Sequence, residues 1–389
     1  MKINIVNKQL IKMKKTIFLS AILAIALIAC KPQQPVTETT PADALCSRLS
    51  KISQKGYMFG HQDDPFYGLT WEYEDGRSDT KELVGDYPAV MGFDIGGIEM
   101  GDLKNLDSVP FNLMREEIIA HHERGGIITI SWHLRNPLNG KTAWIDEDLK
   151  EYEQALADGK SADELIDPKH TVAATLEGGE VHEKFIGWLD KVTEFIGSLK
   201  TSDGEVVPVI FRPWHENTGN WFWWGEANCS AEEYKALWNM TQDYMDERLE
   251  GQLVWSYSPG PRSLEHFLER WPGDDRVQLL GTDAYQYGSD EAYMAQLDRL
   301  LTMMCDYAKE RNILVAVTEC GKTNSVIPDW WTRIFDASVK DFPICYCLPW
   351  RNYPKEHFGP SKETPTAEDF KKFYELPNTL FLNDIKNIK

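Results

Sequence analysis

The sequence lacks several features that mark nucleotide-binding and nucleic-acid-binding proteins. No cluster of Lys and Arg follows the N-terminal segment, and the formal net charge of the 389 residues is −20. Neutralisation of nucleic-acid phosphates is therefore not expected. No glycine-rich turn follows the first predicted strand, which argues against an open, doubly wound sheet that binds a dinucleotide. Nucleic acid and nucleotide cofactors are thus excluded as expected partners.

Cysteine is also scarce, with seven residues in the whole chain. None of their spacings resembles a zinc site. One of the seven, Cys30, belongs to the N-terminal segment, and the sequence does not fix any pairing among the other six. We therefore expect neither a metal nor a cofactor.

The N-terminal segment is not expected to be part of the fold. Five Lys and no acidic residues precede Cys30, and the apolar run at 17–30 is short for a membrane span. The run ends in LIAC, which resembles a bacterial lipobox; an ordinary secretory signal is the alternative. We expect residues 1–29 to be a lipoprotein signal peptide, Cys30 to be lipidated, and the proline-rich residues 30–44 to be a tether. The protein would then be anchored in the cell envelope, facing the periplasm or the outer surface.

Aromatic residues, by contrast, are abundant. They make up 12% of the chain and include 14 tryptophans, four of which fall in the single stretch FRPWHENTGNWFWWG at 211–225. Such large apolar rings need a destination, either in the core or in a groove where they can face the apolar faces of sugar rings.

Eight short apolar runs alternate with helical patterns. Runs of this kind suit strands that are buried on both faces, as in a parallel sheet. The alternation predicts a (β/α)8 TIM barrel, and residues 45–385 are expected to form this single domain. The eight runs span 57–62, 87–95, 126–133, 206–216, 252–259, 277–286, 313–320 and 344–352. The long stretch 134–179 is predicted to be an elaborated loop after the third strand.

Polar side chains gather at the ends of these runs, where a barrel of this kind builds its site. The terminal residues are His61, Asp94, His133, Glu216, Tyr257, Tyr285, Glu319 and Trp350. An isolated glutamate at a strand end is more often half of an ion pair. Two glutamates at the same end of one barrel, however, supply the acid and the second carboxylate that glycoside hydrolysis requires. A separation of about 5–5.5 Å would predict retention of configuration.

The motifs around both glutamates resemble those of glycoside hydrolase family 26. RPWHENTGNWFWWG at 212–225 resembles the acid/base signature of this family, and VTECG at 317–321 looks like its nucleophile strand. SWH, GTDAYQ and LPWRN match in order, so the similarity extends from about residue 45 to 385. The family consists largely of endo-β-1,4-mannanases on (β/α)8 barrels.

The resemblance implies a role for each matching residue. Glu216 would be the general acid/base, with a pKa raised by its aromatic surroundings. Glu319 would be the nucleophile, kept ionised by hydrogen bonds from Tyr285 and Arg212. The remaining implied contacts are to the sugar, with His215, His133 and Asp283 on its hydroxyls, Trp350 as a stacking floor and Trp221 lining the cleft.

The resemblance therefore predicts a retaining, monomeric endo-hydrolase of β-1,4-mannosidic linkages in mannan, galactomannan or glucomannan. A β-1,3-xylanase or a mixed-linkage β-glucanase of the same family is the alternative substrate class. A lipid-anchored protein that binds glycans without cutting them is the alternative of another class.

Overall fold

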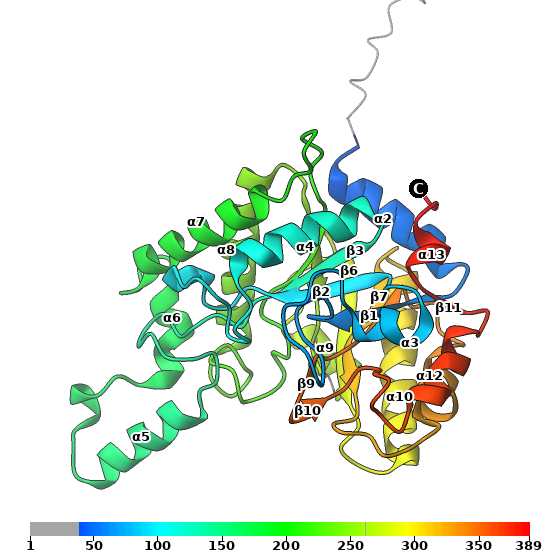
Figure 1. The fold of residues 1–389 in the computed structure, drawn as a ribbon. Helices are drawn as coiled ribbons and strands as arrows, with labels where there is room; N and C mark the ends of the chain where they lie inside the picture. The colour runs from blue at the N-terminus through cyan, green and yellow to red at the C-terminus, as the bar shows by residue number, and fades with distance from the viewer. Residues whose placement is uncertain (1–38, 261) are drawn as a thin grey trace, which may run out of the picture. The chain divides into compact units, whose positions relative to one another are not determined.

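A closed barrel of eight parallel strands forms the centre of this computed structural model, which describes residues 39–260 and 262–389 (Figure 1). The strands pair in chain order, and β1 also pairs with β8, which closes the sheet. The barrel strands are β1 Tyr57–Gln62, β2 Val90–Asp94, β3 Ile127–Ser131, β4 Val209–Arg212, β5 Leu253–Tyr257, β6 Leu279–Tyr285, β7 Leu314–Gly321 and β8 Tyr346–Pro349. Outside the barrel lie β11 Thr379–Leu380, which pairs with β1, and the hairpin of β9 Asn352–Tyr353 and β10 Glu356–His357.

Helices occupy the connections between successive strands, which confirms the predicted (β/α)8 architecture. The α-helices of the described residues are α2 Pro41–Ser53, α3 Asp79–Val84, α4 Phe111–Glu123, α5 Asp146–Ala157, α6 Thr171–Thr175, α7 His182–Gly197, α8 Ala231–Leu249, α9 Leu264–Glu269, α10 Asp290–Lys309, α11 Ala337–Val339, α12 Ala367–Tyr374 and α13 Leu382–Ile385. Short 3-10 turns are η1 Ile98–Met100, η2 Ala162–Glu164 and η3 Pro168–His170, and η4 Trp330–Asp336 is a π-helix.

All eight predicted strands are confirmed, but the fourth is much shorter than the predicted run 206–216. Pro208 and Pro213 flank β4, and proline has no N–H to donate to a sheet. Just beyond β4, Trp214 and Glu216 both adopt left-handed backbone with φ of 53°. Glu216 therefore stands on a tight turn after the strand and not at the end of the strand itself.

Alternation along the strands separates an inner from an outer layer. Met58, Val90, Ile210, Val254 and Leu348 belong to the inner cluster, which the apolar side of α2 covers at one end. The intervening residues, such as Phe59 and Phe211, pack outward among the helices in the larger cluster. Arg212 lies two residues after Ile210 in β4, so its side chain points in the same direction, into the barrel.

The N-terminal boundary of the fold lies earlier than predicted. Helix α2 begins at Pro41 with a capping box between Thr40 and Asp43, so the last residues of the predicted tether 30–44 are helical. Residues 40–389 form one compact unit. The predicted signal peptide, the rest of the tether and Cys30 lie outside the described residues. Among the residues that are described, no helix has both the length and the apolar character needed to cross a membrane.

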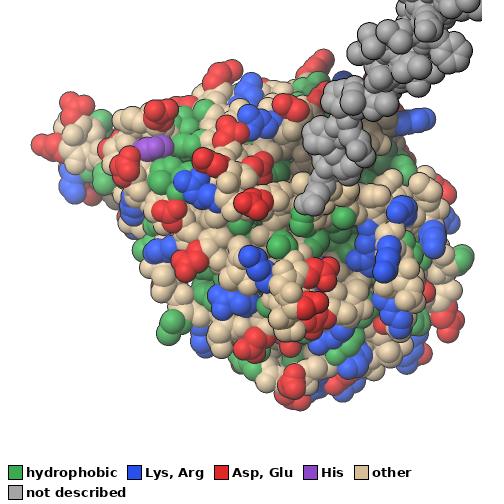
Figure 2. Space-filling view, turned by 90° about the horizontal axis from the view of Figure 1, so that it is seen from above, with side chains coloured by type: hydrophobic (Ala, Val, Ile, Leu, Met, Phe, Trp, Pro, Cys, Tyr) green, Lys and Arg blue, Asp and Glu red, His purple; other side chains and the backbone are tan. Residues whose placement is uncertain are grey.

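The predicted elaborated loop at 134–179 contains α5, η2, η3 and α6, and α5 projects away from the barrel (Figure 1). Acidic and basic side chains are interspersed over the face seen in Figure 2. The six cysteines of the described residues are all free, and four of them are buried.

Candidate active site

Three carboxylates meet at the mouth of the barrel. Glu216 follows β4, Asp283 lies in β6 and Glu319 lies in β7, and one oxygen of each is within 4.8 Å of the others. The two glutamates, 103 residues apart in the chain, are thus close enough to flank a single glycosidic bond.

A β-bulge in β7 gives this side of the site its shape. Thr282 pairs with Val317, but the next residue, Asp283, pairs with Glu319, so Thr318 is an extra residue in β7. The Thr318 hydroxyl donates to Asp283 at 2.7 Å. Because of the bulge, the consecutive residues Thr318 and Glu319 both contribute to the site, which a regular strand would not allow.

Arg212 is the cation between these acids. Its Nη1 donates to Asp283 at 2.9 Å, and its Nη2 donates to Oε1 of Glu319. Arg212 is buried, and although burial alone would lower its pKa, the two carboxylates raise it. The three carboxylates are close enough together to bind a metal ion. The Arg212 guanidinium, however, already pairs with two of them, Asp283 and Glu319.

Tyr285 completes the surroundings of Glu319. Its hydroxyl donates to Oε2 of Glu319 at 2.7 Å, so both oxygens of the carboxylate accept a hydrogen bond. Bonds to both oxygens fix the plane of the carboxylate.

Glu216 has a different environment. Burial and the nearby charge of Glu319 raise the pKa of Glu216 to about 7, against a hydrogen bond from Trp221 that lowers it. That bond runs from the indole Nε1 to Oε2 of Glu216 at 2.6 Å. Since Oε2 accepts from the indole, the proton of the neutral acid belongs on Oε1.

The turn that carries Glu216 is built to bring the Trp221 indole back onto it. The N–H of Glu216 donates to the carbonyl of Ser258 at 2.8 Å, and that of Gly219 donates to the carbonyl of Glu216 at 2.8 Å. A Cβ on Gly219 would lie 2.4 Å from the Trp221 ring, so only glycine leaves room for the indole.

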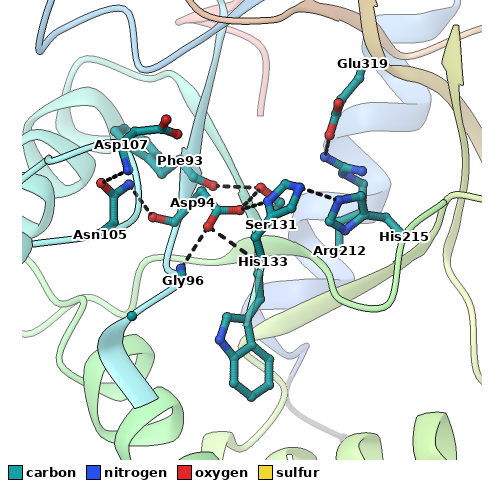
Figure 3. A network of polar contacts seen from close by, with 12 residues as sticks. Phe93, Asp94, Gly96, Asn105, Asp107, Ser131, His133, Arg212, His215 and Glu319 are labelled. Atoms are coloured by element: carbon teal, nitrogen blue, oxygen red, sulfur yellow. Dashed lines mark hydrogen bonds and ion pairs between the residues drawn. The ribbon is translucent and has the colours of Figure 1, made fainter. Parts of the chain in front are cut away.

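A chain of charge and hydrogen bonds extends from β2 to the turn (Figure 3). Asp94 accepts from Nδ1 of His133 at 2.6 Å and from the Ser131 hydroxyl at 2.6 Å. Burial alone would lower the pKa of His133, but the Asp94 carboxylate raises it above its usual value. Burial and the Arg212 charge hold the pKa of His215 well below its usual value.

The same chain brings the two imidazoles together. Their Nε2 atoms are 3.0 Å apart, within hydrogen-bond distance. His215 is buried and its Nε2 is engaged in this bond. Its predicted contact with a sugar hydroxyl therefore remains a prediction, as do the sugar contacts of the other residues.

Aromatic rings line the mouth around the charged groups. The Trp350 ring lies edge-on to His133 at 6.1 Å. Trp144, from the insertion after β3, stacks on His133 at 5.4 Å and contacts Phe222 at 5.4 Å. Trp144 and Trp221 are each 41% exposed, so they present indole surface at this end of the barrel.

All nine predicted catalytic and binding residues therefore gather in one connected site. Two other strand-end residues do not join it. Tyr257 packs among the outer aromatic rings, against Trp238 and Phe267, and His61 bonds to Asp64 under the backbone of Gly359.

The roles of two supporting residues, Asp94 and Thr318, were not predicted from the sequence. Asp94 was recognised as a strand-end residue but not as the partner of His133, because only the pairing of β2 with β3 places Asp94 opposite Ser131. Thr318 gave no signal, since a bulge is not visible in the residue pattern.

A carboxylic acid with a raised pKa and a doubly hydrogen-bonded carboxylate, facing each other at the mouth of a (β/α)8 barrel, define a glycoside hydrolase. The chain belongs to glycosyl hydrolase family 26, whose sequence profile matches residues 34–357.

Solved and curated relatives agree with this assignment. The chain resembles the structure of a GH26 β-mannanase from Bacteroides ovatus, with a TM-score of 0.82 and 39% identity over 90% of this chain and 98% of that one. It is 27% identical to a mannan endo-1,4-β-mannosidase of Bacillus subtilis, covering 82% of each chain. It is 29% identical to one from Bifidobacterium adolescentis, covering 82% of this chain but spanning only 32% of that protein's length.

The alkaline limb of the pH profile is expected to report the protonation of Glu216. If Glu216 donates the proton to the leaving oxygen, kcat/KM falls as pH rises through a pKa of about 7. Trp221→Phe removes the N–H that lowers this pKa, so the limb is expected to move to higher pH. Loss of one hydrogen bond should reduce the maximal kcat/KM by no more than about tenfold.

The matched control is Trp144→Phe, which changes an equally exposed indole that also contacts Phe222. Its alkaline limb should stay with that of the unsubstituted protein. A limb that stays in place in Trp221→Phe, or that moves equally in both variants, would contradict the assignment.

Proposed function

We propose that the protein is a retaining endo-β-1,4-mannanase that hydrolyses mannan, galactomannan or glucomannan by double displacement. The observation that carries this proposal is the approach of the Glu216 and Glu319 oxygens to within 4.8 Å. Inverting enzymes need about 6.5–9.5 Å between carboxyl groups to hold a water molecule, whereas retaining enzymes place them about 5–5.5 Å apart. The names of the similar proteins support mannan as the substrate.

In the first step, Glu319 attacks the anomeric carbon while Glu216 gives its proton to the departing glycosidic oxygen. The bond between the anomeric carbon and that oxygen breaks, and a glycosyl ester of Glu319 forms. The bonds from Arg212 and Tyr285 hold the carboxylate in the plane from which it attacks.

In the second step, Glu216 is ionised and takes a proton from a water molecule, which attacks the anomeric carbon and releases Glu319. Two inversions give a product with the original β configuration. The raised pKa of Glu216 suits both steps, because a group that titrates near neutral pH can give and regain a proton.

Loss of either glutamate is expected to remove hydrolysis without loss of the fold. Glu216→Ala and Glu319→Ala should each lower kcat on mannan by about 10³-fold or more. Circular dichroism should match that of the unsubstituted protein. Glu356→Gln, at an exposed acid in β10, is the matched control and should keep the activity. Hydrolysis at near-normal rate in either alanine variant would sink the assignment.

The substrate and the stereochemistry can be tested in one series of reactions. Mannan, β-1,3-xylan and mixed-linkage β-glucan are incubated with the protein, and released reducing ends are measured. The expected result is release from mannan, with the β-anomer appearing first in the NMR spectrum of a manno-oligosaccharide digest. Preferred release from xylan or glucan would mean that the enzyme hydrolyses that polymer by the same chemistry and is not a mannanase. An initial α-anomer would contradict double displacement.

We also propose, from the sequence alone, that Cys30 carries a lipid that anchors a monomeric enzyme in the cell envelope. In a bacterial host, the full chain should fractionate with membranes and incorporate labelled palmitate. Cys30→Ser should lose the label and leave the membrane fraction. Label that persists in Cys30→Ser would place the modification elsewhere.

A further inference from the structure

Tyr287 stands out among the aromatic side chains at the mouth of the barrel. Its side chain is 87% exposed, more than that of any other aromatic residue in the described part of the chain. It follows β6 by two residues, directly beyond Tyr285, and the two rings lie 6.1 Å apart. The exposure of this phenol ring, so close to Tyr285, which binds Glu319, calls for an explanation.

The backbone beside Tyr287 is firmly held. The N–H of Gln286 donates to the carbonyl of Gly321 at 2.9 Å, and the buried Gln286 side chain accepts from Nε1 of Trp330 at 2.6 Å. The amide of Gln286 also donates to Asp290 at 2.8 Å. Tyr287 therefore projects from a fixed position, so its exposure does not come from a loose loop.

The direction of the Tyr287 ring follows from the anchoring of Gln286. Gln286 points into the protein, so its two neighbours in this extended segment point the other way. Tyr285 uses that direction to donate to Glu319, and the Tyr287 ring lies 6.1 Å from the Tyr285 ring. The Tyr287 ring is thus next to the side chain that binds Glu319.

The position of β6 in the barrel separates this ring from the other aromatic wall. In the closed order β1 to β8, β6 lies across the barrel from β2. Asp94 and His133, from β2 and β3, form one group with Trp350 after β8. Tyr287, two residues after β6, therefore stands across the barrel from that group.

We propose that Tyr287 binds the leaving-group sugar, stacking on the pyranose ring whose oxygen Glu216 protonates. The proposal rests on the function proposed above and adds a residue that selects substrates extending beyond the scissile bond. An exposed phenol ring with a fixed backbone offers a flat apolar face at little ordering cost. The opposite wall of Trp350 and His133 is left for the sugar that is transferred to Glu319.

The test compares two substrates that share the transferred mannobiosyl group. Mannotetraose has a sugar leaving group, whereas β-mannobiosyl fluoride has a leaving group with neither a sugar nor a ring. Tyr287→Ala is expected to lower kcat/KM on mannotetraose by about tenfold, which is the scale of one stacking contact. On the fluoride, kcat/KM should be unchanged. Tyr287→Phe keeps the ring and should behave as the unsubstituted protein on both.

Tyr353→Ala is the matched control, since Tyr353 is an exposed aromatic residue of β9 that packs against Tyr67. It should affect both substrates in the same proportion. Equal losses on both substrates in Tyr287→Ala, or no loss on either, would overturn the proposal. Failure of the proposed function would look different, because the unsubstituted protein would then cleave neither mannoside.

Discussion

One buried guanidinium holds the charges of the site together. Arg212 pairs with Glu319 and Asp283, and all three side chains are close to fully buried. A single buried charge costs several kcal/mol unless it is paired, so the fold has to deliver cation and anions to the same place. Arg212 points inward from β4, and Asp283 and Glu319 point inward from β6 and β7. These strands face β4 because the sheet is closed into a barrel.

The remaining carboxylate is that of Glu216. The guanidinium of Arg212 donates its hydrogen bonds to Asp283 and Glu319 and not to Glu216. Burial and the Glu319 charge outweigh the Trp221 hydrogen bond and the charges of His133 and Arg212, and the pKa of Glu216 rises to about 7. The difference between the two glutamates comes from their surroundings: one is bonded by a cation and a phenol, the other by a single indole. A proton donor and an anion can thus coexist within one sugar's reach.

The sequence was sufficient to predict the eight strands, because apolar runs that alternate with helical patterns are local features. Five of the nine predicted site residues end such runs, and the resemblance to the family implied the other four. Boundaries that depend on backbone geometry were not predictable. The run at 206–216 reads as one strand, yet Pro213 and the left-handed Trp214 and Glu216 turn the chain after Arg212. The Thr318 bulge and the Asp94–His133 bond depend on the pairing of neighbouring strands, which no short segment contains.

The insertion after β3 is coupled to the acid through backbone bonds. The N–H of Ile145 donates to the carbonyl of Trp221 at 2.8 Å, and that of Trp223 donates to the carbonyl of Ala143 at 3.1 Å. These bonds hold the segment that carries Trp221, whose indole donates to Glu216. Gly219 has no side chain and so leaves room for this indole. A loop that looks peripheral in the sequence therefore helps to orient the carboxyl group that donates the proton, because small shifts of a hydrogen-bonded indole change both the position and the pKa of its acceptor.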